Sequence, residues 1–320
     1  MPNRLHSFLL WSLFIALAYL DPLYAATDEK ELAVTTLSNQ EPTGWKQIWS
    51  DEFDGELLDK NKWNLNDSYG RHACFGGGNQ ERQCYLEDQS TIRLIDGLLF
   101  LIAHPQNDLP NGKNFISARI QTRGKLDIKY GRIEARIKLP IGQGVWPAFW
   151  MLPTESVYGD WPHSGEIDIM EAINLGTDCK NCTGKVENRV YGSVYFSEKW
   201  PRKGSKVNAI ELVNFQAFNT YALEWGPESI TWLINDTAYA TIKAQDWYSR
   251  HPSARDNPHA PFDQKFHLIL NLAIGGNWPE YQNQGGVSLE GFPKALIVDY
   301  VRVYKCSTGP GSCAQAASIK

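Results

Sequence analysis

The feature of this sequence that most constrains its fold is a recurrent alternation of apolar and polar residues with a period of two. The alternation is clear at residues 131–139, 221–225, 230–234 and 297–304. Successive side chains of a β-strand point to opposite faces, so this pattern predicts strands with one face in a core. Helical periodicity is hard to find, and turn signals such as Asp96-Gly97 and Asn111-Gly112 separate the segments. We therefore predict an all-β sandwich of two antiparallel sheets.

The composition supports a folded protein and argues against two kinds of partner. The 320 residues are 42% hydrophobic and 21% charged, which excludes global disorder. The net charge is −5 and no block of like charges is present, so we expect neither nucleic acid nor an anionic membrane as a partner. The 12 Trp, 14 Tyr and 13 Phe instead suggest a surface built for stacking.

The N-terminus has the pattern of a secretory signal peptide. A basic start, an apolar run at 8–20 and a small-residue end at Ala25-Ala26 follow one another. A membrane anchor is the alternative, but the run is shorter than the ~20 residues that span a bilayer. We predict a signal peptide at 1–25 and a secreted protein, extracellular or periplasmic, without membrane association after cleavage.

The rest of the chain reads as one domain, because no linker, repeat or compositional break interrupts it. We expect a flexible segment at 26–43, a catalytic domain at 44–306 and a tail at 307–320, and we expect a monomer. The cysteines fall into three close pairs: Cys74 and Cys84, Cys179 and Cys182, Cys306 and Cys313. In an oxidising compartment this grouping favours local disulfides, with zinc at Cys179-x-x-Cys182 as the alternative.

The segment most informative about function places three acids within six residues of an otherwise apolar strand. Glu166 and Asp168 share a face of that strand, but Glu171 lies five positions after Glu166, which in a regular strand would direct it into the core. Burying a lone carboxylate costs several kcal/mol, so we predict a one-residue bulge near Met170 that returns Glu171 to the acidic face.

Three like charges on one narrow patch repel each other. Either a hard cation lies among them, or one acid holds a proton for chemistry. Two carboxyls with separated pKa values suit glycoside hydrolysis, in which a gap of ~5–5.5 Å gives retention of configuration. A solvent-facing acidic strand without function is the structural alternative.

Tryptophans near the acids favour a sugar ligand, because the apolar C–H faces of sugar rings stack on indole. Trp146 and Trp150 share strand parity just before the acids, Trp161 precedes them by five residues, and Trp278 follows the turn at Gly275-Gly276. Each of these residues could instead fill the core of a large sandwich.

At this point the sequence resembles the laminarinase-like branch of glycoside hydrolase family 16, from about Trp45 to Tyr304. The resemblance rests on Trp49-Ser-Asp-Glu-Phe-Asp54, the segments 129–140 and 144–153, Gly165-Glu-Ile-Asp-Ile-Met-Glu171, and the segment 270–279. The acid motif with its extra Met matches the bulged form of the family's β-1,3-glucanases. Lichenases and xyloglucan transglycosylases have the unbulged form.

The resemblance implies a β-jelly-roll with a substrate cleft across its concave sheet. In that cleft Glu166 would be the nucleophile, Glu171 the general acid/base, and Asp168 the neighbour that holds the nucleophile and assists proton movement. Catalysis needs no cofactor. The residues that would contact substrate are Asn79, Arg119, Trp146, Trp150, Trp161 and Trp278. A bridged loop from Cys74 to Cys84 would fix one rim of the cleft.

The resemblance also implies a structural calcium site on the convex side. Its ligands would be Glu52, the carbonyl of Gly97 and Asp299, which are suited to a hard cation. A plain Glu and Asp pair near the joined termini is the alternative.

One position departs from the family pattern. Laminarinases have His in a cleft strand where this chain has Tyr195, within Gly192-Ser-Val-Tyr-Phe196. Tyrosine can donate a hydrogen bond but titrates near 10 rather than ~6.5, so substrate preference and pH profile do not carry over.

We therefore expect a secreted, retaining endo-β-glucanase that hydrolyses β-1,3-glucan, with mixed β-1,3/1,4-glucan as a further candidate substrate, through a covalent glycosyl-enzyme intermediate. The alternatives are a transglycosylase or a hydrolase of another polysaccharide with the same fold. A non-catalytic β-glucan recognition protein and a calcium-dependent lectin are weaker, since all three acids are present and lie on one strand.

Overall fold

The computed structural model describes residues 41–65, 74, 78–86, 89–197, 203–282, 285–309 and 312–313, which belong to one compact unit beginning at Glu41. The predicted signal peptide at 1–25 lies outside the described residues, as do most of the segment 26–43 and most of the tail 307–320. The domain boundaries therefore stay predictions. Within the described part of the chain, no helix has the length and apolar character needed to cross a membrane.

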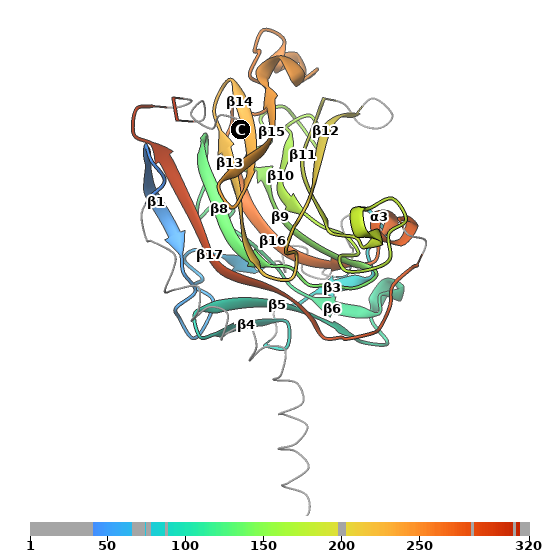
Figure 1. Cartoon of the computed structure of the whole chain (residues 1–320). Coiled ribbons are helices and arrows are strands. Elements are labelled where there is room, and N and C mark those ends of the chain that lie inside the picture. The colour runs from blue at the N-terminus through green and yellow to red at the C-terminus, as the bar shows by residue number, and fades with distance from the viewer. Residues whose placement is uncertain are drawn as a thin grey trace, which may run out of the picture. The chain divides into compact units, whose positions relative to one another are not determined.

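The described strands form two sheets, shown in Figure 1. The strands of the first sheet are β1 (Trp45–Asp51), β3 (Gln83–Tyr85), β4 (Ile92–Ile95), β5 (Leu98–Pro105), β6 (Phe115–Ser117), β8 (Gly131–Lys138), β13 (Phe218–Trp225), β14 (Ser229–Ile234), β15 (Thr237–Lys243) and β17 (Lys294–Cys306). Those of the second sheet are β2 (Asn64–Leu65), β7 (Arg119–Gln121), β9 (Val145–Pro153), β10 (Glu166–Glu171), β11 (Arg189–Ser197), β12 (Lys203–Glu211) and β16 (Phe266–Ile274).

The helices between these strands are short. They are the 3₁₀ turns η2 (Pro110–Gly112), η3 (Thr183–Lys185), η4 (Ala244–Asp246) and η5 (Pro252–Ala254), and the α-helix α3 (Asn277–Tyr281). The sequence pattern indicated only a turn where α3 begins. The all-β prediction is confirmed.

The order of strands in the first sheet is β15-β14-β13-β8-β17-β5-β6-β3, with β1 beside β17 and β4 beside β5. In the second sheet it is β12-β11-β10-β9-β16-β7-β2. The pairs are antiparallel, as predicted, except that β3 runs parallel to β6. β3 precedes β4 and β5 in the chain and joins the sheet at the β6 edge, where its direction matches that of β6.

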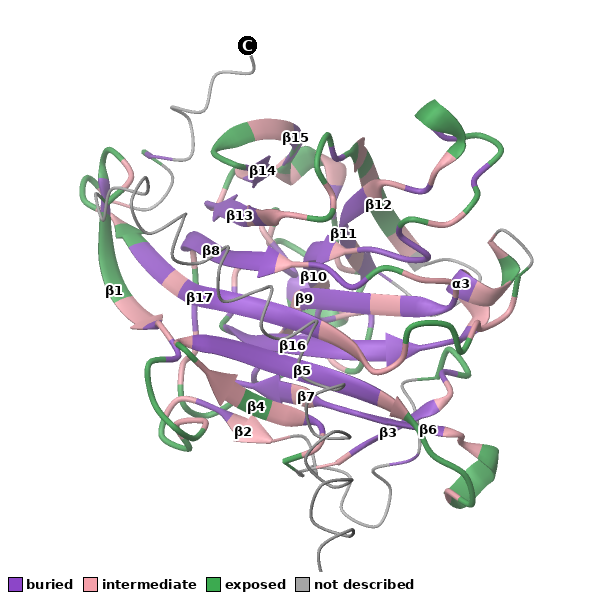
Figure 2. Ribbon diagram, turned by 60° about the horizontal axis from the view of Figure 1, so that its bottom comes forward, coloured by how far each residue is buried: buried purple, intermediate pink, exposed green. Residues whose placement is uncertain are grey.

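The core lies between the two sheets and follows the alternation seen in the sequence. On β8, Ile133, Ala135 and Ile137 are fully buried in the main apolar cluster, together with Phe149 of β9 in the other sheet. The intervening charged residues of β8, among them Arg132, lie on the opposite face. Figure 2 shows the buried residues concentrated in central strands such as β8, β17, β9 and β16.

The three predicted local disulfides are present: Cys74 to Cys84, Cys179 to Cys182, and Cys306 to Cys313. The described part of the chain has no free cysteine. The zinc alternative at Cys179-x-x-Cys182 is wrong for this structure, because sulfurs joined to each other are not available as thiolate ligands.

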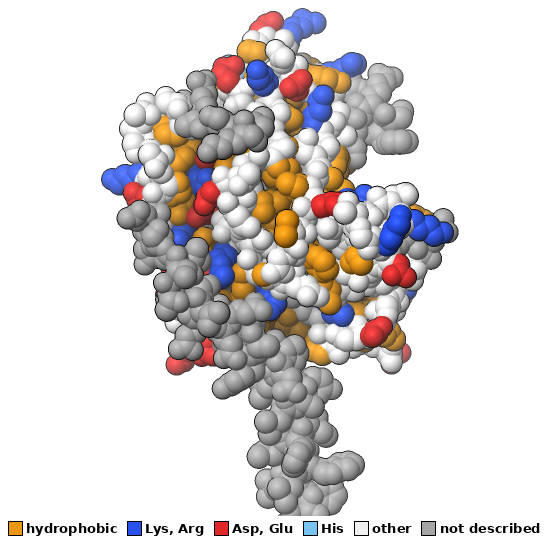
Figure 3. Space-filling view, in the orientation of Figure 1, with side chains coloured by type: hydrophobic (Ala, Val, Ile, Leu, Met, Phe, Trp, Pro, Cys, Tyr) orange, Lys and Arg blue, Asp and Glu red, His pale blue; other side chains and the backbone are white. Residues whose placement is uncertain are grey.

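Figure 3 shows the face of the molecule that Figure 1 turns toward the viewer. Hydrophobic side chains gather in its centre, and most of the charged side chains lie toward its edge. The acidic and basic groups are interspersed there, in keeping with the absence of charge blocks in the sequence.

We expect Gly131→Ala to be strongly destabilising, because Gly131 begins β8 with a φ of 144° and an added Cβ would lie 2.5 Å from the backbone oxygen of Tyr304. The matched control is Gly124→Ala, where φ is also positive, at 70°, but the added Cβ meets nothing within 4 Å. Backbone strain alone should cost the control about 1–2 kcal/mol of unfolding free energy, whereas the clash should add about 1–3 kcal/mol at Gly131. Urea denaturation of both variants measures this; equal losses would show that the close approach is unimportant.

Candidate active site

The strand β10 contains the predicted bulge. On the β11 side Glu166 lies opposite Tyr195, and Glu171 lies opposite Tyr191, so five steps on β10 match four on β11. On the β9 side the irregularity falls between Asp168 and Met170. One extra residue is thus inserted between Asp168 and Glu171, as the sequence predicted.

The bulge sends two consecutive side chains into the core. Ile169 and Met170 both join the main apolar cluster and are almost completely buried. The parity of the strand changes at this step, so that Glu171 returns to the face that carries Glu166 and Asp168. We call this face of the second sheet the site face.

Tyr195 lies opposite Glu166 on the neighbouring strand β11 and is influenced by all three carboxylates. Burial is the main cause that raises the pKa of the Tyr195 hydroxyl, and the negative charges of Asp168, Glu171 and Glu166 raise it further. Tyr195 therefore keeps its proton through neutral and moderately alkaline pH. It presents a hydroxyl to the site where a histidine would change charge near pH 6.5.

Trp161 stands over the first acid. Its indole N–H donates a hydrogen bond to Glu166 Oε2 at 2.8 Å, and its ring centre lies 6.4 Å from that of Tyr195. The side chain is 45% exposed, so one face of the indole stays available to a ligand. Trp161 thus orients a Glu166 oxygen with a neutral donor while offering a stacking surface.

A second aromatic group surrounds Glu171. The Trp146 indole N–H donates to Glu171 Oε1 at 3.0 Å. Trp278 on α3 meets Trp146 edge-on, with 5.4 Å between ring centres, and meets Tyr191 edge-on at 4.9 Å. We call Trp146, Tyr191 and Trp278 the aromatic wall. Tyr191 was not predicted from the sequence, although it shares strand parity with Tyr195.

The environment of Glu171 favours its neutral form. Burial raises the pKa of Glu171 to about 7, and the hydrogen bond from Trp146 opposes that rise in part. A carboxyl that holds its proton near neutral pH suits a general acid. Asp168, between the two glutamates, is 2% exposed, and its backbone oxygen accepts a hydrogen bond from the Trp232 indole at 2.8 Å.

The site face continues from β10 across β9 and β16 to β7. Trp150 lies opposite Asp168, and its indole N–H donates to Asn271 Oδ1 at 2.7 Å. Asn271 in turn donates to the Tyr85 hydroxyl at 3.1 Å. The Arg119 guanidinium lies over the Trp150 ring, 4.9 Å from its centre. The structure therefore places Trp150 and Arg119 together beside the acids.

Asn271 and Tyr85 were missed in the sequence analysis. Asn271 had a signal that could have identified it, since it is a polar residue within the otherwise apolar run 268–274. Tyr85 had no such signal, because its contact with Asn271 joins positions 186 residues apart.

Asn79 lies at the rim of the aromatic wall. Its backbone oxygen accepts from the Asn277 N–H at 2.7 Å, where α3 begins. A Cβ added at Gly276, whose φ is 101°, would lie 3.1 Å from that oxygen and 3.4 Å from Trp146 Cζ3, so Gly276 permits this close approach. The Cys74 to Cys84 disulfide closes the loop that carries Asn79.

The three residues predicted to bind calcium lie on or next to neighbouring strands: Glu52 follows β1, Gly97 precedes β5, and Asp299 is within β17. Asp51 pairs with Val301, and Leu99 pairs with Val298, so Glu52, Gly97 and Asp299 all lie near the same part of β17. Two carboxylates and a carbonyl are suitable donors for a hard cation. However, Glu52 accepts two hydrogen bonds from Arg302, at 3.0 and 2.8 Å, and Asp299 accepts one from Arg136 at 2.7 Å.

Comparison with known proteins identifies close relatives of this chain. The family model described as "Glycosyl hydrolases family 16" matches residues 89–286. The chain is 36% identical over 291 residues to a glucan endo-1,3-beta-glucosidase A1 of Niallia circulans, covering 87% of this chain and 40% of that protein. It is 41% identical over 265 residues to a beta-glucanase of Rhodothermus marinus, covering 82% of this chain and 85% of that one.

A solved structure gives the same result for the fold. The X-ray structure of the laminarinase from Rhodothermus marinus matches with a TM-score of 0.66 at 36% identity, covering 82% of this chain and 97% of the other. The two-sheet architecture described above is thus the β-jelly-roll that the sequence analysis expected.

We expect Glu171→Gln to stabilise the fold in a pH-dependent manner. Because the folded-state pKa of Glu171 is about 7 against ~4.3 unfolded, the folded protein binds the extra proton between these values, and its stability falls as pH rises through them. Glutamine removes this loss, so the gain in unfolding free energy over wild type should grow from pH 4 to pH 8, by at most about 3 kcal/mol. Glu56→Gln, at an exposed position, is the control. Urea denaturation of both variants at pH 4 and pH 8 measures the gain. If the difference in unfolding free energy between Glu171→Gln and wild type is the same at both pH values, the raised pKa of Glu171 is contradicted.

Proposed function

The chain belongs to glycosyl hydrolase family 16 and is a glycoside hydrolase, and we propose that it cleaves β-1,3-glucan within the chain, with retention of configuration. The observation that carries the proposal is the bulge of β10, which returns Glu171 to the face of Glu166 and leaves one acid beside Trp161 and the other within the aromatic wall. The similar proteins are named a glucan endo-1,3-beta-glucosidase and a beta-glucanase, which supports glucan as the substrate. Mixed β-1,3/1,4-glucan is a further proposed substrate.

In the first step the Glu166 carboxylate attacks the anomeric carbon as the bond to the leaving oxygen breaks. Glu171 gives its proton to that oxygen, so that the departing sugar leaves as a neutral alcohol. The pKa of about 7 supplies the protonated Glu171 in neutral solution. Trp161 holds a Glu166 oxygen by a neutral N–H, so the hydrogen bond orients the nucleophile without an opposing full charge.

In the second step Glu171, now ionised, takes a proton from water as the water oxygen attacks the anomeric carbon. The bond to Glu166 breaks, and both carboxyl groups return to their starting states. We assign Asp168, which is buried between the two glutamates, to holding Glu166 in place and keeping the proton on Glu171 while Glu166 is charged.

The surrounding residues suit a sugar chain. The exposed Trp161 offers a stacking surface beside Glu166, Trp150 with Arg119 over its ring lies beside Asp168, and Asn79 lies at the rim near Trp146. Trp278 completes the wall behind Glu171. The Tyr195 hydroxyl is assigned as a hydrogen-bond donor to substrate whose strength does not change with pH in the neutral range.

We also propose that the protein is secreted and acts as a monomer. The signal-peptide pattern at 1–25 supports secretion, and the three disulfides suit an oxidising compartment. A single chain supplies every residue assigned to the site, so the proposed mechanism needs no partner subunit.

We expect Glu166→Gln and Glu171→Gln each to lower kcat on laminarin by about a thousandfold or more while leaving the circular dichroism spectrum unchanged. Laminarin, lichenan, agarose and xyloglucan should be digested in parallel, with laminarin cut fastest and the β-anomer formed first in the proton NMR spectrum. A wild-type rate in either variant, or initial formation of the α-anomer, would contradict the mechanism.

Glu171→Gln should still react with an activated aryl glycoside, because a good leaving group needs no proton from Glu171. Mass spectrometry of the digested variant should then find the sugar on Glu166. Label on another residue would reject the assignment of the nucleophile.

Calcium at Glu52, Gly97 and Asp299 remains a proposal. The ion would have to share or displace the contacts that Arg302 and Arg136 make to the two carboxylates. We expect calcium at ~100 times its Kd to raise the Tm of wild type by about 5 °C or more and to leave Asp299→Asn unchanged. Magnesium is the control ion. If wild type has the same Tm in calcium as in a chelator, the proposed calcium site is rejected.

A further inference from the structure

Trp278 is held from outside the site by a chain of hydrogen bonds. Its indole N–H donates to Gln282 Oε1 at 3.2 Å, and Gln282 Nε2 donates to Glu187 Oε2 at 3.1 Å. Gln282 is the residue after α3, and Glu187 precedes β11. Neither side chain has a role in the mechanism above, yet together they connect the aromatic wall to the segment between β10 and β11.

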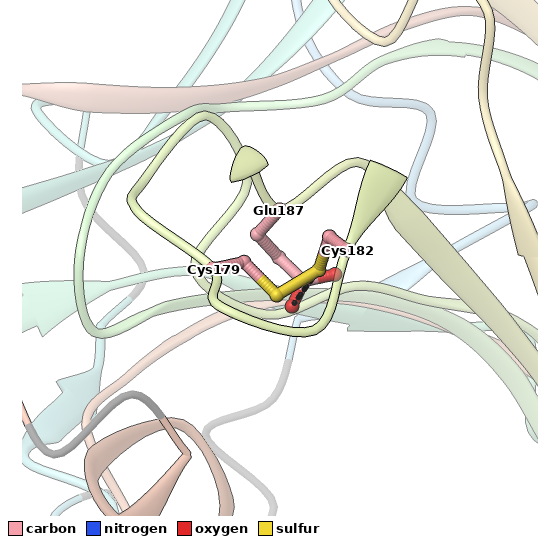
Figure 4. Close-up of side chains that lie close together, drawn as sticks. All are labelled: Cys179, Cys182 and Glu187. Atoms are coloured by element: carbon pink, nitrogen blue, oxygen red, sulfur yellow. Dashed lines mark hydrogen bonds between the residues drawn. A yellow bond between two sulfur atoms is a disulfide. The ribbon is translucent and has the colours of Figure 1, made fainter. Parts of the chain in front are cut away.

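Glu187, at the end of this chain of hydrogen bonds, is itself held in place by its surroundings. The residue is 0% exposed, and its carboxylate accepts from Arg189 Nε at 2.7 Å and from the Arg189 backbone N–H at 3.2 Å. Figure 4 shows the carboxylate against the disulfide, where Cys182 Sγ lies 3.5 Å from Glu187 Oε2. The backbone of Glu187 pairs with Gly176 and Thr177, at 2.8 Å in each case.

Asn174 holds the other side of α3. Its side chain is fully buried, accepts from the Gly144 N–H at 2.7 Å, and donates to the backbone oxygens of Pro279 at 2.8 Å and Gln282 at 3.3 Å. The segment that follows β10 therefore supports α3 at two points. Through the Asn174 contacts the backbone of α3 is fixed, and through Glu187 and Gln282 the indole of Trp278 is fixed.

We propose that Glu187 and Gln282 are positioning residues that hold Trp278 against Trp146 and Tyr191, and so keep the aromatic wall closed to water beside Glu171. This inference rests on the proposed function in one respect, because it takes Glu171 to be the general acid. Neither residue touches the acids. Gln282 also contacts Tyr191, so their effect passes through Trp278 and Tyr191 to Trp146, whose indole makes the hydrogen bond to Glu171.

The groups that face Glu171 explain why the exclusion of water controls its pKa. Its own strand contributes Glu166 and Asp168, and β11 contributes Tyr191 and Tyr195. β9 and α3 contribute Trp146 and Trp278, which do not titrate. Burial favours the proton on Glu171, whereas admitted water would stabilise the carboxylate and lower its pKa.

The test is Gln282→Met, which keeps the length of a half-buried side chain but removes its hydrogen bonds to Trp278, Glu187 and Tyr191. The titration of Glu171 should be followed by NMR of protein labelled with ¹³C at glutamate carboxyls, with the signal assigned from its loss in Glu171→Gln. We expect the Glu171 pKa to fall by about half a unit to one unit. The basic limb of kcat/KM should shift with it, so that kcat/KM at pH 8 falls about three- to tenfold relative to that at pH 5.

Glu211→Gln is the matched control. The Glu211 carboxylate is exposed and accepts from the N–H of Thr183, the residue after the Cys179 to Cys182 disulfide, at 3.1 Å. In Glu211→Gln the pKa of Glu171 and the pH dependence of kcat/KM should be the same as in wild type. Glu187→Gln is the second variant. It weakens the support that Glu187 gives to Gln282, so we expect the Glu171 pKa to shift downward in this variant as well.

A Gln282→Met protein in which Glu171 titrates as in wild type would overturn the inference, whatever the substrate. If the wild-type protein cuts no glucan but the Glu171 pKa still falls in Gln282→Met, the proposed function is rejected and the positioning role is retained. A uniform loss of activity at every pH, with the Glu171 pKa unchanged, would indicate a structural role and also overturn the inference.

Discussion

The site depends on one irregularity in one strand. The extra residue in β10 lets Ile169 and Met170 both pack into the core, so Glu171 reaches the same face as Glu166 without loss of apolar burial. In a regular strand one of two requirements would fail: either the acid would enter the core, or the apolar side chains would leave it. The bulge satisfies both, and the flanking strands β9 and β11 keep their antiparallel pairing on either side of it.

The acids of the site and the acids of the framework have different partners. Glu187 is paired with Arg189, and Glu52 with Arg302, so these carboxylates are neutralised by guanidinium groups. Glu166 and Glu171 accept instead from the indoles of Trp161 and Trp146. An indole N–H fixes the direction of a carboxylate but supplies no full positive charge, so burial still raises the pKa of Glu171. Such an arrangement costs stability in the ionised state and provides an acid that is protonated near neutral pH.

Support for the site comes from segments that are distant in the sequence. The aromatic wall unites Trp146 of β9, Tyr191 of β11 and Trp278 of α3. Asn79 lies at the rim of this wall because Gly276 permits a close approach of the two backbones, and the Trp150 indole donates a hydrogen bond to Asn271. The contacts of Gln282 and Glu187 extend this arrangement to the Cys179 to Cys182 disulfide.

The sequence by itself determined the two-sheet fold, the pairing of the cysteines by proximity and the bulge, because each depends on local order along the chain. Alternation reveals the buried face of a strand, and the odd spacing of Glu171 from Glu166 requires an inserted residue wherever both must avoid the core. Only the tertiary structure decided which tryptophan meets which acid, that Asn271 and Tyr85 belong to the site, and that α3 is held by Glu187. Those contacts join residues brought together by sheet register and loop packing, and neither the residue types nor their spacing specifies which partner a buried polar group will find.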